Sequence, residues 1–253
     1  MITSLLFFPE KEIIEHPADY GLTAEDVYPI TADGVKLHGW YFQARDAKSA
    51  LLFLHGNAGN ISGRVHKAQG WIERGVSVLL LDYRGYGRSE GEIRHGEDIV
   101  WDAQAGLDWL VKHKAWTLNK IILYGESLGS YPVIRLAIDH KAAGLILEAP
   151  FTTFSDLAAI HYPALPKFIV ESLLKDFRFD NIGIISKIQT PFFILYGTAD
   201  ATCPFAMGEK LFESAPEPKS FFNVPDAGHN NLAEVAAENY WNKPQEFLKE
   251  KRL

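Results

Sequence analysis

One stretch near the middle of the chain constrains the fold more than any other. Residues 120–124, Lys-Ile-Ile-Leu-Tyr, form a largely apolar run, and Gly-Glu-Ser-Leu-Gly follows at 125–129. A buried strand, a serine at a sharp turn and a helix after it are typical of a nucleophile elbow. Side chains at Gly125 and Gly129 would collide with the neighbouring strand or helix. The stretch predicts that Ser127 presents its hydroxyl above a sheet, beside N–H groups of a helix N-terminus. The alternative is a serine N-cap on an ordinary strand–helix turn.

Composition limits the classes of protein to consider. The 253 residues are 47% hydrophobic and 13% aromatic, which is enough for a single α/β domain over residues 1–253 with a large core. A net charge of −7 and the lack of a basic run argue against a nucleic-acid partner. Cys203 is the single cysteine, so there is no internal disulfide framework, and the dispersed histidines predict no metal site.

Apolar runs and helical patterns alternate along the chain, which predicts a mostly parallel central sheet flanked by helices. An antiparallel hairpin is expected first, because strands at 27–31 and 36–43 flank the turn sequence Ala32-Asp33-Gly34. Further strands are expected at residues 50–54, 76–81, 120–124, 145–147, 192–196 and 220–224. Helices are expected at residues 62–74, 98–113, 205–214 and 232–251, and directly after Ser127.

The alternation stops at about residues 154–188, where we expect a short helical cap inserted between two strands. Six side chains of this segment are candidates for the wall of a substrate groove: Tyr162, Leu165, Phe168, Ile169, Leu173 and Leu174. The alternative is that such apolar residues pack the cap onto the domain. Because a short insert cannot build a deep roof, we expect acyl chains of about two to eight carbons, each buried methylene adding up to about 0.8 kcal/mol.

Two residues downstream of the serine are candidates for its catalytic partners. A serine hydroxyl near neutral pH needs a base, and the base needs a group that orients it. After a nucleophile elbow, the partners follow in the order acid, then histidine. Asp200 follows the strand at 192–196, at the carboxyl end of a parallel strand where α/β sheets place their chemistry, and His229 follows the last strand. The order and positions predict a Ser127–Asp200–His229 triad.

Other residues compete for these two roles. Asp226 is the chief competitor for the acid, but it lies three residues from His229 and is more typical of a turn. Asp82 also ends a strand but precedes the serine, so we interpret it as structural. His161 in the cap is the rival base. A single loop aspartate or histidine has no catalytic meaning by itself, so the hypothesis depends on the order of the three residues.

Two N–H groups are needed to bind the negative oxygen that forms when a serine attacks a carbonyl. The backbone of Leu128, directly after the serine, is one candidate. The other is the backbone of Asn57, in a glycine-rich loop that His55 and Gly56 help to shape. Such a loop before a helix can also cradle a phosphate, but no Gly-Lys-Ser/Thr sequence occurs and the spacing does not match the dinucleotide fingerprint.

Three motifs together resemble the α/β-hydrolase superfamily, and the resemblance covers nearly the whole chain. They are His-Gly-Asn-Ala-Gly-Asn at 55–60, Asp-Tyr-Arg-Gly-Tyr-Gly-Arg-Ser at 82–89 and Gly-Glu-Ser-Leu-Gly-Ser at 125–130. They are similar to a branch of α/β-hydrolase-domain serine hydrolases that contains acylglycerol lipases, protein depalmitoylases and bacterial homologues. The resemblance implies a Ser127–Asp200–His229 triad and hydrolysis of esters or thioesters without a cofactor. The chain lacks a palmitoylatable cysteine cluster, which weakens the transfer of depalmitoylase biology.

Many members of that branch carry a transmembrane or lipid anchor before a Phe-Phe-Pro-like segment. Residues 1–9 of this chain are apolar but far too short to span a bilayer, and they lack the basic flank and cleavage site of a signal peptide. We interpret them as a hydrophobic tuck onto the domain, the alternative being the stub of an anchor. The expected location is cytoplasmic, or membrane-associated if an anchor was removed.

The sequence thus predicts a serine hydrolase that cleaves small-molecule acyl esters or thioesters through an acyl-enzyme, with no cofactor. One alternative is a serine peptidase of the same fold, similar to aminopeptidases, although those commonly use a larger cap that bears carboxylates for a substrate amine. Another is a non-catalytic binding protein on a hydrolase scaffold, against which the complete candidate triad argues.

Overall fold

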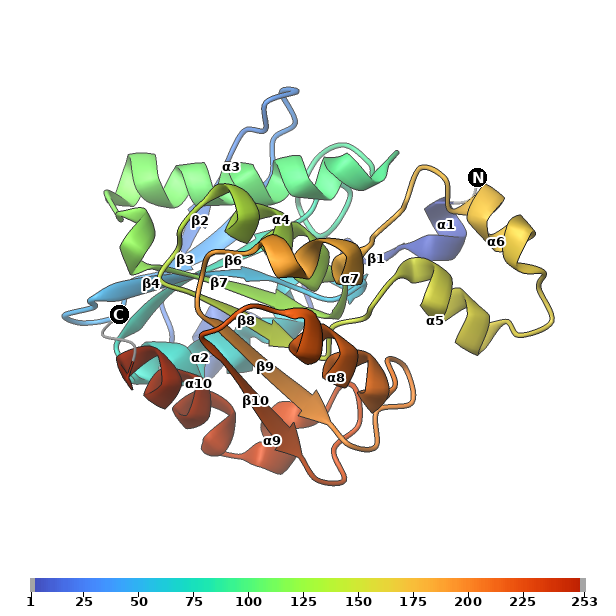
Figure 1. Cartoon of the computed structure of the whole chain (residues 1–253). Helices are drawn as coiled ribbons and strands as arrows, with labels where there is room; N and C mark the ends of the chain where they lie inside the picture. The colour runs from blue at the N-terminus through green and yellow to red at the C-terminus, as the bar shows by residue number, and fades with distance from the viewer. Residues whose placement is uncertain (1–2, 251–253) are drawn as a thin grey trace.

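The structure, a computed structural model, describes residues 3–250 and contains a β-sheet with helices on both faces (Figure 1). In this described part, the main sheet has eight strands: β2 (Glu25–Val27), β3 (His38–Phe42), β4 (Ser49–Leu54), β6 (Val76–Asp82), β7 (Ile121–Glu126), β8 (Gly144–Glu148), β9 (Phe192–Gly197) and β10 (Lys219–Val224). Strands β6 to β9 are buried along their entire length, as their continuous apolar runs predict.

The strands lie side by side in the order β10-β9-β8-β7-β4-β6-β3-β2. The pairs β2–β3 and β3–β6 are antiparallel, and every other neighbouring pair is parallel. The prediction of a mostly parallel sheet preceded by an antiparallel hairpin is therefore confirmed. Parallel strands end at the same edge of the sheet, so the loops that follow β4, β7, β9 and β10 gather there.

Six helices cover the two faces of the sheet: α2 (Val65–Glu73), α3 (Gly96–Lys114), α4 (Ser130–Asp139), α8 (Phe205–Ser214), α9 (Leu232–Ala236) and α10 (Asn239–Glu250). Alternate residues of each strand face opposite sides, which divides the core in two. Leu52 and Leu54 belong to the layer with α3, α4 and α8. Leu51 and Phe53 belong to the layer with α2, α9 and α10.

The segment predicted to form a cap lies between β8 and β9 and contains α5 (Phe154–His161), α6 (Lys167–Leu173) and α7 (Asn181–Ile184). The N-terminal helix α1 (Thr3–Leu6) lies beside it, at the same end of the molecule (Figure 1). The short strand β1 (Phe8–Pro9) pairs with β5 (Ala58–Gly59). Phe7 is buried and packs edge-on against Phe177 and Phe179. The predicted tuck thus holds for Leu6 and Phe7, whereas Leu5 and Phe8 are exposed, and residues 1–2 lie outside the described part.

Three boundaries differ from the prediction. The first strand of the hairpin is β2 at 25–27 rather than 27–31, and beyond it Ile30 and Lys36 form an isolated bridge. The helix predicted at 62–74 begins as a 3-10 turn before α2. The helix predicted at 232–251 is two helices, α9 and α10, because the chain bends at Ala237, which has a φ of 47°. The short 3-10 turns are η1 (Pro17–Tyr20), η2 (Ile61–Arg64), η3 (Leu118–Lys120), η4 (Ser127–Gly129) and η5 (Ile185–Lys187).

Candidate active site

The turn at Ser127 has the sharp geometry that the sequence predicts. Strand β7 ends at Glu126, and Ser127 takes a φ of 49°, a left-handed conformation that is strained for a residue with a side chain. A Cβ on Gly125 would lie 2.5 Å from the carbonyl oxygen of Gly129, and one on Gly129 would lie 2.8 Å from the carbonyl carbon of Leu54. The two glycines therefore allow the turn to pack closely against α4 and β4.

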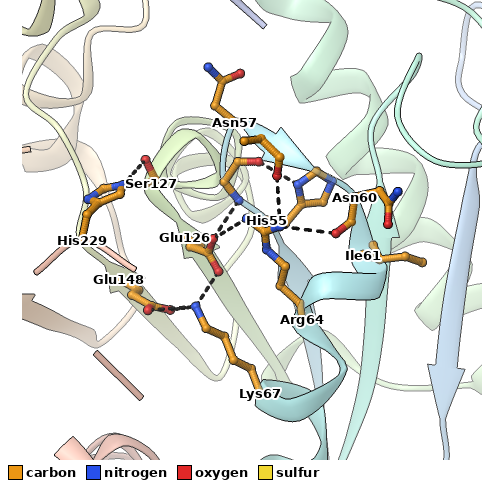
Figure 2. A network of polar contacts seen from close by, with 12 residues as sticks. His55, Asn57, Asn60, Ile61, Arg64, Lys67, Glu126, Ser127, Glu148 and His229 are labelled. Carbon is orange, nitrogen blue, oxygen red and sulfur yellow. Dashed lines mark hydrogen bonds and ion pairs between the residues drawn. The ribbon is translucent and has the colours of Figure 1, made fainter. Parts of the chain in front are cut away.

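Hydrogen bonds join Ser127 to the two residues predicted as its partners. The Nε2 atom of His229 lies 3.1 Å from Ser127 Oγ, as Figure 2 shows, and its Nδ1 atom lies 2.7 Å from Asp200 Oδ2. The other carboxylate oxygen of Asp200 accepts the N–H groups of Thr202 and Cys203, each at 2.8 Å. Because Asp200 is buried and held by the backbone, it fixes the orientation of the imidazole.

The residues that compete for the acid and base roles make other contacts. Asp226 is exposed, takes a left-handed φ of 60° and donates its N–H to Thr198 Oγ1, so it forms a turn. His161 lines the same cavity as Ser127, but its Nε2 atom lies 2.8 Å from the carbonyl oxygen of Thr202, whereas the ring that bonds Ser127 Oγ is that of His229. Asp82 is buried behind the loop after β4, where it accepts the N–H of Ile61 and lies 3.3 Å from His55 Nε2. These contacts give Asp82 the structural position expected of it.

Asn57 and Leu128 lie on the same cavity as Ser127. The side-chain amide of Asn57 donates to the carbonyl oxygen of Leu6, and the Asn57 carbonyl accepts the hydroxyl of Tyr86 at 2.8 Å. Within the described residues, no acceptor faces the backbone N–H of Asn57. The loop is thus held through its other polar groups while this N–H stays available to a ligand.

The cavity in front of Ser127 has a volume of about 380 Å³, within the range of sites for small ligands. Its walls come from several elements and include Leu5, Phe8, Phe154, Leu157, Tyr162 and His229. Tyr162, which the sequence predicts to contact the substrate, thus lines this cavity, and 62% of its surface is exposed.

Of the other five predicted groove-lining residues, Leu174 also lines this cavity, and Leu165, Phe168, Ile169 and Leu173 do not. Leu165 lines a neighbouring cavity of about 680 Å³, Phe168 is 72% exposed, and Ile169 is half-buried on α6. Pro163 and Pro166 interrupt the cap between α5 and α6, and the lining of the cavity comes from α5 and Tyr162 before this break and from Leu174 after it.

Cys203 also lines the cavity, which sequence reasoning did not anticipate. Burial and the nearby carboxylate of Asp200 raise the pKa of its thiol. The thiol therefore stays protonated at neutral pH and is a poor nucleophile beside Ser127.

A second feature that sequence reasoning missed is a network of buried charges beneath the elbow (Figure 2). Glu126 accepts hydrogen bonds from Arg64 at 2.8 Å and from Lys67 at 2.7 Å, and Lys67 also bonds Glu148 at 3.0 Å. The hydroxyls of Tyr124 and Tyr240 complete it by donating to Glu148. Burial would raise the pKa of Glu126, but the two cations outweigh it and hold that pKa well below its usual value. The only signal in the sequence was a charged residue inside the elbow.

In residues 3–250, His, Cys, Asp and Glu side chains form no group of three or more that could hold a metal ion. Over the same residues, none of the helices combines the length and apolar character needed to cross a bilayer.

Comparisons with known proteins place these features in a family. A family model described as serine aminopeptidase, S33 matches residues 45–182. The α/β hydrolase domain-containing protein WAV2 of Arabidopsis thaliana is 32% identical over 249 residues, which cover 92% of this chain and 80% of the relative. An uncharacterized membrane protein of Saccharomyces cerevisiae is 30% identical over 244 residues, covering 94% and 84%.

Solved structures show the same fold. The esterase Pf2001 of Pyrococcus furiosus superposes with a TM-score of 0.79 at 22% identity, over 97% of each chain. The match at this identity concerns the fold, and the relatives above carry the family assignment. The chain therefore belongs to the α/β-hydrolase superfamily, within the family described as serine aminopeptidase, S33.

Proposed function

We propose that the protein is a serine hydrolase that cleaves carboxylic esters or thioesters through an acyl-enzyme on Ser127. One observation carries the proposal, namely the hydrogen-bonded chain from Asp200 through His229 to a serine on a cavity wall. Nucleophile, base and orienting acid are the parts that acyl transfer by serine requires.

In the proposed reaction, Ser127 Oγ attacks the acyl carbon while His229 Nε2 takes the hydroxyl proton. Asp200 stabilises the imidazolium, and the N–H groups of Asn57 and Leu128 bind the carbonyl oxygen as it becomes negative. The intermediate then breaks its bond to the alcohol or thiol, which leaves with the proton from His229. Water then attacks the acyl-enzyme and gives a proton to His229, and the bond to Ser127 Oγ breaks as His229 returns that proton to Oγ, which releases the acid and the free serine.

The dimensions and lining of the cavity support small-molecule acyl substrates. A cavity of about 380 Å³ with apolar walls takes a short or medium acyl chain, and we expect the best hydrolysis at about two to eight acyl carbons. The test is kcat/KM for 4-nitrophenyl esters and thioesters from acetyl to palmitoyl. A maximum at palmitoyl would contradict the short-chain assignment while leaving the reaction class intact.

The hypothesis that the protein is an aminopeptidase has weaker support in this chain. A peptidase that binds a substrate amine needs a free carboxylate near the nucleophile. Among the described residues that line the cavity, Glu126 is the one acidic side chain, and Arg64 and Lys67 already neutralise it. We therefore expect hydrolysis of aminoacyl 4-nitroanilides to be at least about 100-fold slower than that of acyl esters.

Membrane association remains a proposal, which the name of the yeast relative supports. Leu5 and Phe8 on the N-terminal segment and Tyr162 on the cap are largely exposed at the mouth of the cavity. Apolar side chains at such a rim can enter a lipid surface. Co-sedimentation of the protein with phospholipid vesicles, compared with the Leu5→Ser/Phe8→Ser variant, tests this, and equal sedimentation of the two would contradict it.

A further inference from the structure

The carboxylate of Glu126 connects the elbow to the loop after β4. Glu126 immediately precedes Ser127 in the chain, and its Oε1 atom accepts the backbone N–H of Gly56 at 3.3 Å. The same oxygen accepts Nη2 of Arg64 at 2.8 Å. The two strand ends that carry Leu128 and Asn57 are thus joined through a single carboxylate.

Arg64 holds the far side of the same loop. Its Nη1 atom donates to the carbonyl oxygens of Ala58 at 3.0 Å and Asn60 at 3.4 Å (Figure 2). Gly56 and Ala58, the neighbours of Asn57 on each side, are therefore both bound to the Arg64–Glu126 pair. The position of the Asn57 N–H relative to the elbow depends on that pair.

The fit between loop and elbow is close. A Cβ on Gly56 would lie 2.9 Å from Glu126 Oε1 and 3.5 Å from Ser127 Cβ. Neither the loop nor the elbow has room to shift toward the other without disturbing the carboxylate. Small displacements of an oxyanion-binding N–H matter, because a misplacement of about 1 Å can cost about 100-fold in rate.

Stability alone is a weak explanation for this arrangement. The side chains of Arg64, Glu126 and Lys67 are 17%, 11% and 7% exposed. Removing charges from water costs much of what their attraction returns, and apolar packing of similar volume stabilises a fold as well or better. A rigid, forked hydrogen-bonding group that reaches a carboxylate and two carbonyls provides orientation, which apolar packing does not.

We propose that Arg64 and Glu126 are positioning residues, which set the spacing between the Asn57 and Leu128 N–H groups that receive the oxyanion. The inference rests on the proposed function and extends it to the groups that act through the backbone. Lys67 donates to the second carboxylate oxygen of Glu126 and also to Glu148 on β8, so it joins the pair to that strand.

The test uses three variants and a matched control in the full chain. Arg64→Met removes the charge and the fork, Arg64→Lys keeps the charge but loses the fork, and Glu126→Gln keeps the shape but loses the charge. The control is Arg74→Met, because Arg74 also lies at an end of α2, is 14% exposed and pairs with a carboxylate, Glu238, away from Ser127. Circular dichroism and thermal melting establish that each variant folds.

The primary readout is kcat and KM for an acetyl ester. We expect Arg64→Met to lower kcat by about 10- to 100-fold with KM changed by less than about 3-fold, because a fully lost oxyanion donor costs about 100- to 1,000-fold. Arg64→Lys should fall between Arg64→Met and wild type, and Arg74→Met should match wild type. Should Arg64→Met fail to fold, Arg64→Lys and Glu126→Gln test the inference, since each leaves fewer unpaired groups.

A second readout separates positioning from a general structural role. In a thionoester, sulfur replaces the carbonyl oxygen, and an oxyanion site shaped for oxygen disfavours it. The ratio of ester to thionoester kcat/KM measures how much the reaction depends on the two N–H donors. If Arg64 and Glu126 position these donors, the ratio falls in their variants because ester hydrolysis loses more than thionoester hydrolysis. A merely structural defect lowers both rates together and leaves the ratio unchanged.

The outcomes separate this inference from the proposed function. A wild-type protein that hydrolyses no ester would overturn both. An active wild type with Arg64 and Glu126 variants that match Arg74→Met, or that lose rate with an unchanged ratio, would overturn the positioning role alone. A lower kcat together with a lower ratio supports it.

Discussion

Two groups of side chains meet at Ser127, and they are built differently. His229 contacts the hydroxyl and Asp200 contacts His229, each through one hydrogen bond, and both residues come from loops at strand ends. Arg64, Glu126, Lys67 and Glu148 lie beneath the elbow as a chain of alternating charges, and the first two bond the loop backbone. Arg64 and Glu126 line the cavity as His229 does, so the two groups differ in what they contact: His229 bonds the hydroxyl that would react, whereas Arg64 and Glu126 bond the backbone of the neighbouring loop.

The largest expected effect is at the residue that both groups share. Ser127→Ala should lower ester hydrolysis by about 10⁴- to 10⁶-fold while the fold persists, because no hydroxyl remains to attack. Ser214→Ala, at the exposed end of α8, is the matched control. Initial rates with a 4-nitrophenyl ester measure both, and comparable activity in the two variants would remove Ser127 from the proposed mechanism.

The next largest effect is expected at Asp200, the proposed orienting acid of the first group. Asp200→Asn should cost about 1,000-fold or more in kcat, because the amide no longer stabilises the imidazolium or its tautomer. Asp226→Asn should leave kcat within about 2-fold, since an exposed turn residue has no such role. Steady-state kinetics of the pair measure this, and the opposite order of effects would assign the acid to Asp226.

A smaller effect tests the second group through the loop that it holds. Gly56→Ala should lower kcat by about 10-fold, because the new methyl would meet Glu126 Oε1 at 2.9 Å and displace the Asn57 N–H. Gly63→Ala is the control, since nothing lies within 4 Å of a Cβ there. Equal kcat values for the two variants would show that the loop tolerates displacement, against the inferred spacing.

The smallest effect concerns stability and pH. Because the folded protein holds the pKa of Glu126 well below its usual value, this carboxylate stabilises the fold above its ordinary pKa of about 4.3, and that stability is lost as the pH falls below it. The Tm of Glu126→Gln should therefore lie below that of wild type at pH 7, and the difference should shrink as the pH falls from about 4 to 3. Each kcal/mol corresponds to about 2–4 °C in a chain of this size. A gap that stays constant from pH 7 to pH 3 would contradict the assigned ion pairs.

The two groups also differ in how far the sequence predicted them. Apolar runs in the sequence predict the parallel strands, and the loops that follow these strands carry Asp200 and His229 in the required order. Chain order and strand ends are local properties, so the fold, the elbow and the candidate triad could be predicted together.

The charge network could not be predicted in that way. Arg64 directly precedes α2, Lys67 lies within α2, and Glu148 ends β8. Lys67 joins Glu148 to Glu126 on β7, so the network depends on the packing of three separate elements. The substrate-contacting residues show the same limit. The apolar positions of the cap and its prolines were visible in the sequence, but which of its two halves faces Ser127 is decided by tertiary packing, which leaves Phe168 exposed.

The most direct test of the account is the covalent reaction of the protein with a fluorophosphonate, followed by intact-mass measurement and peptide mapping. Such reagents need a serine made nucleophilic by a base. The account predicts one adduct per chain, located on Ser127 and absent from Ser127→Ala. No adduct on the folded wild-type protein, or an adduct that persists in Ser127→Ala, would contradict the claim that Ser127 is the activated nucleophile.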